Sequence, residues 1–507
     1  MRDSAKSVRA WGLLVMPVRG APVCALAMAG LSLMFLSVAI WNGFPLIFYD
    51  TGAYVLEGLG RVFLVERAPV YAEFLFLTGA RFSLWPVVIV QALMTSYLIL
   101  EVARAEVPGL TLRGLLAIGA LLSLFTGIAW YAGQVEPDIF TPMVILGMWL
   151  LLFRSRRLGN AGRGWVTGLT ALAVASHPSH LGLLAGLVIA AGLFKLWQYA
   201  PARLPFARAS APEGEVAVAS LAGAQARAGA PKAKMRRPEG VKIDLRRGSI
   251  VLAASLALIV AGNFVLTGKL FLSKSGSVFL FARLMQDGIV QRLMDDTCPP
   301  AGTENWRLCN FKNRLPKSAN AWLWGERSGF RALGGFTNER QQQEDRRIIL
   351  ETIKRYPMMH LRAAVSDSLL QFLQFKTGDG IEPQLSIQER PFRRVIPEQI
   401  PAYLEARQQQ GMIRFKTLNL IHMPAGAMSL LGLLLLLQHA AIRRAWDEAS
   451  LPALVLLGLI GNAVICGTFS NPHDRYQSRI IWLPSLVLLL AVTRDRRALQ
   501  PVPESGT

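Results

Sequence analysis

Residues 451–469 read LPALVLLGLIGNAVICGTF, and this stretch decides the fold class because it contains no charged side chain. An α-helix rises about 1.5 Å per residue, so a run of this length can cross a hydrocarbon core of about 30 Å. Lipid cannot satisfy backbone polar groups, and a helix bonds them internally. The stretch therefore predicts a transmembrane α-helix.

Comparable apolar runs recur along the chain and predict about ten spans. They lie at residues 21–44, 84–103, 114–130, 139–153, 165–176, 181–197, 250–266, 418–437, 451–469 and 480–492. The run at 165–176 is short, so it and the next run form either two spans or a partly re-entrant hairpin around His177, Pro178 and His180. The composition agrees, since 52% of the 507 residues are hydrophobic and 17% are charged. We therefore expect an all-α membrane protein.

The basic surplus follows the predicted topology. A formal net charge of +21 would suggest nucleic-acid binding in a soluble protein. Here the basic residues cluster on one side of the spans: Arg2, Lys6, Arg9 and Arg19; Arg154, Arg156 and Arg157; Arg443 and Arg444; Arg494, Arg496 and Arg497. By the positive-inside rule that side is the cytoplasm. We expect a bacterial inner-membrane protein with both termini cytoplasmic, no nucleic-acid partner, and contacts with anionic membrane lipids.

The chain divides into five parts: an N-terminal transmembrane region (1–200), a basic cytoplasmic linker (201–248), one span (249–268), a periplasmic insertion (269–416) and a C-terminal transmembrane region (417–507). The linker offers little apolar surface to offset the cost of ordering it. The insertion is expected to be mainly helical, with helices at 344–356 and 359–375 separated by Pro357. The apolar loop 45–83 predicts interfacial helices along the outer leaflet.

The four cysteines fall into two classes. Cys24 and Cys466 lie within spans and are most simply small apolar residues. Cys298 and Cys309 lie in the outer insertion, where an oxidising compartment permits a disulfide. A zinc site is the weaker alternative, because no His lies near them. We expect the two insertion cysteines to be paired.

Ionisable residues gather at the outer ends of the predicted helices: Asp50, Glu66, Arg67, Glu136, Asp138, His177, His180, Arg475 and Arg479. Charged groups near the hydrocarbon boundary are costly and are usually kept where they face a polar cavity. Each one alone could equally be a solvated helix end. As a group they predict a polar site on the outer face.

Three short segments resemble the glycosyltransferase C superfamily, membrane enzymes that move a sugar from a polyprenyl phosphate to an acceptor outside the cytoplasm. Residues 49–54, YDTGAY, are similar to the family's acidic motif after the first span. Thr51 stands where the family commonly has a second acid. Glu136-Pro137-Asp138 resembles the acidic motif before the fourth span, and residues 474–479, DRYQSR, resemble the Arg-Tyr segment entering the last span.

The resemblance implies roles for these residues. Asp50 would be the general base of an inverting transfer, with Glu66 as the alternative. Carrier phosphate would be bound by Arg67, Arg475, Tyr476 and Arg479, although an Arg-Tyr segment can also be an interfacial anchor. His177 and His180 could bind the phosphate or a metal, or could form a polar lining of the cavity. Glu136 and Asp138 could share a divalent cation, Mg or Mn, or could instead complement a helix N-terminus.

The implied partners are a polyprenyl-phosphate-linked sugar donor and an envelope glycan, lipid or protein acceptor on the periplasmic face. A polysaccharide polymerase or ligase would use the same architecture, so it remains an alternative. A secondary transporter is a further alternative, although transporters usually show internal halves and binding residues near the bilayer midplane.

Overall fold

The computed structural model describes residues 14, 16–199, 241–300, 302 and 306–498. Most of the predicted linker, and the predicted cytoplasmic Arg2, Lys6 and Arg9, lie outside these residues. The described part consists of α-helices, short 3-10 helices and two isolated β-bridges, with no strand. The predicted all-α class is therefore confirmed.

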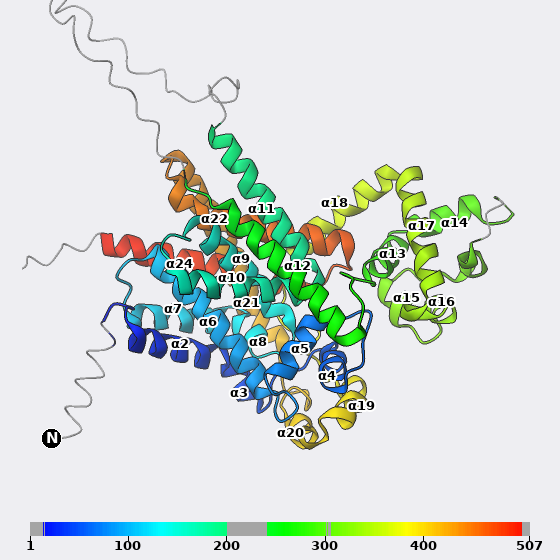
Figure 1. The fold of residues 1–507 in the computed structure, drawn as a ribbon, viewed down its shortest axis with the longest axis horizontal. Helices are drawn as coiled ribbons and strands as arrows, with labels where there is room; N and C mark the ends of the chain where they lie inside the picture. The colour runs from blue at the N-terminus through cyan, green and yellow to red at the C-terminus, as the bar shows by residue number, and fades with distance from the viewer. Residues whose placement is uncertain (1–13, 15, 200–240, 301, 303–305, 499–507) are drawn as a thin grey trace, which may run out of the picture.

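Apolar helices form a bundle that makes up most of the molecule (Figure 1). Within the described ranges, six helical segments are long and apolar enough to cross a membrane: α6 (Trp85–Glu106), α11 (Pro178–Tyr199), α12 (Leu245–Thr267), α21 (Phe415–Ile442), α22 (Trp446–Phe469) and residues 474–497, which comprise α23 (Asp474–Ser478) and most of α24 (Leu483–Ala498). Shorter apolar helices accompany them: α2 (Ala21–Phe35), α7 (Leu112–Phe125), and η1 (Pro137–Ile139) with α9 (Phe140–Phe153). The predicted run at 165–176 falls in α10 (Asn160–Ala175). Each of the ten predicted runs thus contains helix, and six helices reach spanning length.

Two predicted runs are broken where the sequence pattern is continuous. The first divides into α2 and α3 (Ser37–Asn42), and the third into α7 and α8 (Ile128–Ala132). Thr126 explains the second break, because its hydroxyl donates to the Leu122 carbonyl at 2.6 Å and accepts from the Ile128 N–H at 3.4 Å. The Thr126 hydroxyl thereby bonds to the last turn of α7 and to the first residue of α8, and its extended backbone ends α7.

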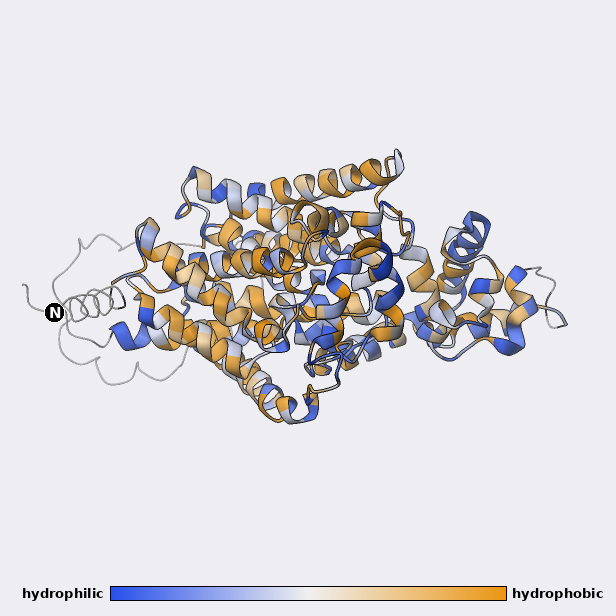
Figure 2. Ribbon diagram, turned by 90° about the horizontal axis from the view of Figure 1, so that it is seen from below, coloured by the Kyte–Doolittle hydropathy of each residue, from blue (hydrophilic) through white to orange (hydrophobic). Residues whose placement is uncertain are grey.

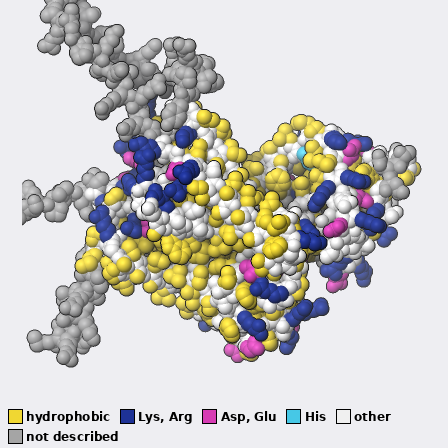
Figure 3. Space-filling model, in the orientation of Figure 1, with side chains coloured by type: hydrophobic (Ala, Val, Ile, Leu, Met, Phe, Trp, Pro, Cys, Tyr) yellow, Lys and Arg dark blue, Asp and Glu magenta, His cyan; other side chains and the backbone are white. Residues whose placement is uncertain are grey.

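The surface of the bundle is apolar where lipid would contact it. Large side chains are exposed on α11, α12 and α21, including Leu193, Phe264 and Leu431. Hydrophobic side chains cover the middle of the molecule in Figure 3, and Lys and Arg gather toward its ends. Hydropathy follows the same division in Figure 2. These features fit a multi-pass membrane protein.

A helical lobe, called the insertion lobe below, projects from one end of the bundle (Figure 1). It contains α13 (Gly276–Gln286), α14 (Ile289–Thr297), η3 (Arg307–Arg314), α15 (Ala319–Trp324), α16 (Gly329–Ala332), η4 (Gly335–Thr337) and α17 (Glu339–Arg355). Its separate core includes Phe281 and Trp322. Cys298 and Cys309 are joined by a disulfide, as predicted.

The insertion lobe is attached to the bundle by α18 (Pro357–Leu373), which packs against α22. The predicted helices 344–356 and 359–375 correspond to α17 and α18, and Pro357 occupies the first turn of α18. The buried Arg283 of the lobe forms an ion pair with Asp367 of α18. The lobe therefore has a defined position at the C-terminal end of α22, where Gly467 lies against Asp367 of α18.

Short helices complete this end of the molecule. The predicted interfacial loop contains α4 (Thr51–Gly60) and α5 (Pro69–Leu77), both packed largely into the bundle. Helix α4 also packs against α19 (Leu385–Val395), which is followed by η5 (Pro397–Gln399) and α20 (Ile400–Glu405). These elements hold the loop 45–83 in place, which is called the first outer loop below after its predicted location.

Candidate functional site

The first outer loop and the segment before α9 lie side by side. Leu46 forms a parallel β-bridge with Gln134. The Thr51 hydroxyl donates to the Val135 carbonyl at 3.0 Å and accepts from the Phe48 N–H at 2.9 Å. Asp50, at the start of α4, is thereby held near Glu136, although the two residues are far apart in sequence.

Two arginines face the Asp50 carboxylate. The Arg67 side chain donates to Asp50 Oδ1 at 2.7 Å. Arg475 Nη2 lies 3.9 Å from Asp50 Oδ2. The first contact is a charge-assisted hydrogen bond, and the second is too long to be one. One oxygen of Asp50 is therefore fixed, while the other faces a guanidinium across a gap.

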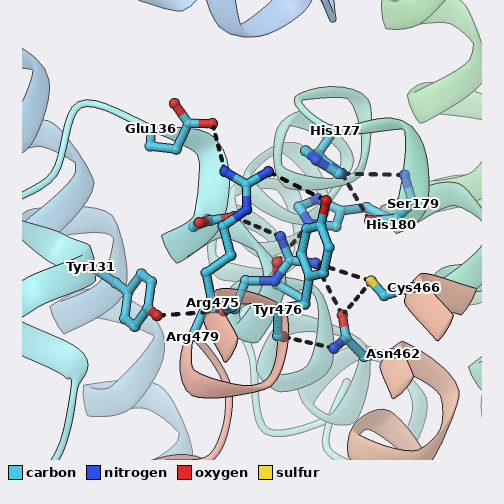
Figure 4. Close-up of polar contacts among 12 residues, drawn as sticks. Tyr131, Glu136, His177, Ser179, His180, Asn462, Cys466, Arg475, Tyr476 and Arg479 are labelled. Carbon is cyan, nitrogen blue, oxygen red and sulfur yellow. Dashed lines mark hydrogen bonds and ion pairs between the residues drawn. The ribbon is translucent and has the colours of Figure 1, made fainter. Parts of the chain in front are cut away.

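Arg475 lies within 4 Å of two acids, Asp50 and Glu136, without a hydrogen bond to either. Figure 4 shows its ion pair with Glu136. Its Nη1 lies 3.9 Å from Glu136 Oε1 and is buried without any hydrogen-bond partner among the described residues. The guanidinium lies 4.1 Å from the centroid of the Phe48 ring, a cation–π distance. Buried polar groups are normally bonded. The unused donor of Arg475 is therefore a place where an anionic or hydroxyl group could bind.

Glu136 is buried and has an unpartnered Oε2. Burial raises the pKa of the Glu136 carboxyl well above its ordinary value, and the nearby Asp50 charge raises it further despite the opposing effect of Arg475. A carboxyl held toward its neutral form neutralises Arg475 less. This leaves the positive charge of Arg475 directed toward the space beside Asp50.

Asp138 and Arg479 form a separate pair deeper in the bundle. Arg479 donates to Asp138 Oδ1 at 2.6 Å and to Asn462 Oδ1 at 3.0 Å, and its side chain is fully buried. Removing one partner of a buried ion pair leaves an uncompensated charge and is strongly destabilising. Arg479, predicted from the sequence to bind phosphate, is thus engaged within the bundle.

The two acids of the predicted Mg or Mn site, Glu136 and Asp138, both lie next to arginines. Asp138 is bonded to Arg479, and Glu136 faces Arg475. In the part of the chain that the structure describes, no three His, Cys, Asp or Glu side chains are grouped to hold a metal. Two guanidiniums beside the two acids would also repel a divalent cation. The residues present do not fit the Mg or Mn site.

The two histidines of the α10–α11 turn differ in their bonding. His180 is buried, with Nδ1 2.7 Å from the Ala173 carbonyl and Nε2 2.7 Å from the Thr141 hydroxyl. A carbonyl can only accept, so His180 Nδ1 carries the proton and Nε2 accepts from Thr141. Both ring nitrogens of His180 therefore form bonds that join α9, α10 and α11. Neither nitrogen is left for the phosphate contact that the sequence predicted.

His177 keeps one ring nitrogen for other contacts. Its Nδ1 accepts from the Ser179 N–H at 3.3 Å, which assigns the proton to Nε2. Burial lowers the pKa of His177 well below its ordinary value, and the neighbouring His180 and Arg479 lower it further. His177 is thus a neutral Nε2–H donor near Arg475, and its predicted contact with phosphate remains open.

Tyr476 and Glu66 take different positions around the site. The Tyr476 ring lies 4.9 Å from the Arg475 guanidinium and 5.2 Å from that of Arg479, so it separates the two cations. The charge of Glu66 acts on the neighbouring Arg67, but its carboxylate makes no hydrogen bond or ion pair with the described residues. Asp50 faces two arginines, so it is better placed than Glu66 to be the acid of the candidate site.

Asp379 is a site residue that the sequence did not identify. It accepts from the Arg475 backbone N–H at 3.1 Å and lies 3.5 Å from His473 Nδ1. Burial alone would raise the pKa of Asp379, but the bonds from His473 and Arg475 lower it overall. Asp379 therefore holds the segment that carries Arg475.

A Gly-Asp-Gly turn explains the position of Asp379. Gly378 and Gly380 have φ angles of 112° and 79°, which favour glycine. A Cβ atom on Gly380 would lie 1.8 Å from the Phe48 ring, so only glycine allows this approach. The paired glycines are the sequence feature by which the turn could have been recognised.

Trp324 of the insertion lobe also reaches the site, with its ring centroid 6.0 Å from the Arg67 guanidinium. Its side chain is half-exposed. Nothing in the local sequence around Trp324 indicates a contact with the first outer loop. The lobe therefore borders the site through the same arginine that binds Asp50.

No family model matches the chain, and no curated protein or solved structure matches it.

Proposed function

We propose that the protein is a membrane glycosyltransferase with the architecture of the glycosyltransferase C superfamily. It crosses the bilayer about ten times, with both termini cytoplasmic, and transfers a sugar from a polyprenyl phosphate on the periplasmic face of a bacterial inner membrane. The observation that carries the proposal is the pairing of Asp50 with Arg475 at 3.9 Å, in which a carboxylate fixed by Arg67 faces a buried guanidinium whose Nη1 has no hydrogen-bond partner among the described residues.

In the proposed reaction, Asp50 is the general base. Its Oδ2 accepts the proton of the acceptor hydroxyl, whose oxygen forms a bond to the anomeric carbon of the sugar. The bond from that carbon to the phosphate oxygen breaks, and the polyprenyl phosphate leaves from the opposite face with inversion. Arg67 fixes Asp50 through the bond to Oδ1 and so orients Oδ2.

Arg475 binds the carrier phosphate and stabilises the negative charge that grows on it as it leaves. A guanidinium offers two parallel donors that match two phosphate oxygens. Arg475 Nη1 has no hydrogen-bond partner among the described residues, so it can donate without breaking an existing hydrogen bond. His177 Nε2–H supplies a further neutral donor. In this proposal the arginines provide the positive charge that a divalent metal ion would otherwise supply.

Two alternatives use the same surfaces. A polysaccharide polymerase or ligase would present a lipid-linked glycan rather than a single sugar to Asp50. A transporter is disfavoured because Asp50, Glu136 and Arg475 meet where the first outer loop packs on the bundle, not on two matching halves. Substrate size in a transfer assay separates the first alternative, and an absence of any transfer product favours the second.

The test uses purified full-length protein reconstituted in vesicles with radiolabelled polyprenyl-phosphate sugars and a membrane extract as acceptor. We expect transfer by the wild type. Arg475→Ala should weaken binding of polyprenyl phosphate roughly 10- to 100-fold, since a charged hydrogen bond is worth about 1.5–3 kcal/mol. Arg414→Ala, at the start of α21, is the matched control because its charge lies outside the site. Equal binding by wild type and Arg475→Ala would contradict the proposal.

A further inference from the structure

A cavity lies at the end of the bundle that carries the basic clusters. Its volume is about 420 Å³, and it lies between the α6–α7 turn, the segment before α2 and the end of α9. An isolated β-bridge between Pro17 and Thr111 and a hydrogen bond from the Val18 N–H to the Leu110 carbonyl at 2.7 Å hold two of these walls together. The cavity is thus part of the packed bundle.

Charge distinguishes this cavity from an ordinary surface hollow. Four arginines line it, Arg19, Arg104, Arg154 and Arg157, against one acid, Glu101. Glu101 accepts from Arg104 at 2.8 Å and is therefore already neutralised. We call this cavity the arginine pocket.

The other three arginines retain donors. Arg154 is only 7% exposed, and although Glu106 and Asp447 bind its terminal nitrogens, its Nε is buried without a hydrogen-bond partner in the described part of the chain. Arg157 gives one bond to the Ala105 carbonyl, and the exposed Arg19 side chain makes no hydrogen bond to a described residue. Arg104 and Arg154 are paired with acids, whereas Arg19 and Arg157 have no acidic partner among the described residues, and their like charges favour an anion in the cavity.

We propose that the arginine pocket binds the phosphate of an anionic phospholipid from the cytoplasmic leaflet. Phosphate oxygens accept the parallel donors of guanidinium groups. Val18, Leu110 and Leu158 supply apolar walls for the glycerol end of the headgroup. Anionic lipids are concentrated on the cytoplasmic side, where basic clusters attract them. A soluble phosphate compound shares the headgroup chemistry, and the experiment separates the two sources.

The test compares two double variants that remove the same charge. Arg19→Ala with Arg157→Ala removes two exposed arginines of the pocket. Arg113→Ala with Arg156→Ala removes two exposed arginines at the same end of the bundle but outside the pocket. The full-length protein in neutral detergent is titrated with short-chain phosphatidylglycerol, short-chain phosphatidylcholine and glycerol 3-phosphate, and the bound molecules are counted by native mass spectrometry.

We expect the wild type to bind phosphatidylglycerol in preference to phosphatidylcholine. The pocket variant should bind phosphatidylglycerol about tenfold or more weakly, since each basic group that contacts the lipid is worth about 1 kcal/mol. The control variant should stay within about twofold of wild type, because its two arginines lie outside the pocket. Thermal unfolding of both variants checks that the fold is retained. Glycerol 3-phosphate should bind much more weakly than the lipid.

Three results would overturn the proposal. Equal binding of the two lipids by wild type would remove the headgroup preference. Equal losses in the two double variants would mean that general surface charge, not the pocket, attracts the lipid. Glycerol 3-phosphate binding as tight as that of the lipid would assign the pocket to a soluble phosphate compound.

Discussion

Asp50 and Arg475 are held 3.9 Å apart by different elements, and each has a separate partner that fixes it. Arg67 fixes the Asp50 carboxylate, and Asp379 fixes the backbone of Arg475. Neither partner occupies the gap between the two side chains. The gap is therefore a consequence of how four residues from separate segments are anchored, rather than of loose packing.

Asp50→Asn should reduce sugar transfer by about 10²- to 10⁴-fold, the usual effect of losing a positioned base. Asparagine keeps the size of the side chain and can still accept from Arg67, but it cannot take the acceptor's proton. Binding of polyprenyl phosphate should stay close to wild type. Initial transfer rates and lipid binding, measured on the same reconstituted preparations, check both expectations.

Two acid variants control this prediction. Glu398→Gln changes an exposed acid of η5 outside the site and should leave transfer unchanged. Glu66→Gln should retain most activity, because its carboxylate makes no hydrogen bond or ion pair with the described residues. Near-normal transfer by Asp50→Asn together with an inactive Glu66→Gln would move the general base to Glu66.

Glu57 makes stability depend on pH. Burial raises the pKa of Glu57 to about 8, partly offset by the bond from the Leu64 N–H and by Arg67. Between the ordinary pKa of 4.5 and about 8, the folded protein keeps a proton that the unfolded chain has released. Stability therefore falls as pH rises through this window.

Glu57→Gln should remove this loss, because the amide stays uncharged. We expect variant and wild type to unfold at similar temperatures at pH 4.5, and the variant to be more stable at pH 8.5 by an amount on the order of a few kcal/mol. Thermal unfolding in detergent across this pH range is the measurement. Parallel pH profiles for the two proteins would contradict the assignment.

The site could be predicted only where its residues stand next to recognisable helix ends. Asp50, Glu136 and Arg475 each border an apolar run, so their positions followed from the topology. Asp379 and Trp324 lie in the long insertion, and they reach the site through tertiary contacts that no local pattern encodes. The bonds of both His180 ring nitrogens and of the two terminal Arg479 nitrogens could not be predicted, because sequence shows residue type but not the partners of each nitrogen.

At the level of helices, α4 and α5 are in close contact where they pair. A Cβ atom added to Gly58 would lie 2.2 Å from the Ala72 carbonyl oxygen of α5. Gly58→Ala must therefore push the two helices apart, at a cost of about 1–3 kcal/mol. Because Asp50 directly precedes α4, we expect lower transfer activity together with a lower unfolding temperature.

Gly168→Ala on α10 is the matched control, since a Cβ atom there meets nothing within 4 Å. Alanine is the better helix former, so this variant should be unchanged or slightly more stable, by up to about 1 kcal/mol. Unfolding temperature and transfer rate are measured for both variants. If Gly58→Ala behaves like Gly168→Ala, the close pairing of α4 and α5 is wrong.

Helices were easier to predict than the breaks within them. Apolar runs identify a helix because lipid leaves the backbone no other partner. The division of the third run depends on the hydroxyl bonds of Thr126, a residue type that is also common inside helices. Similarly, α12 begins at Leu245 rather than at the predicted Ile250, because the polar turn that precedes Ile250 is helical as well.

Across the whole molecule, the insertion lobe contacts both sides of the candidate site. Trp324 lies over Arg67, which binds Asp50. Gln286 donates to Asn471 at 2.8 Å, in the segment that leads from α22 to Arg475. The lobe thus contacts residues next to both Asp50 and Arg475, so its position can affect the distance between these two side chains. The lobe and the site therefore lie on the same side of the membrane.

That arrangement leads to a prediction about topology. The insertion lobe and the arginine pocket lie at opposite ends of the bundle, and the basic clusters at the pocket end predict that it is cytoplasmic. Lys317 of the lobe and Arg156 beside α9 are both exposed. With Cys24 and Cys466 replaced by alanine and the disulfide kept, Lys317→Cys or Arg156→Cys provides a single reactive thiol.

A membrane-impermeant maleimide should label the Lys317→Cys protein in intact spheroplasts, and the Arg156→Cys protein only after permeabilisation. The charge asymmetry is the physical reason, because basic loops are retained in the cytoplasm during insertion. Glu398→Cys, beside the first outer loop, tests the same side independently of the lobe and should label like Lys317→Cys. Labelling in the reverse order would put Asp50 and Arg475 in the cytoplasm, and a periplasmic transferase would then be excluded.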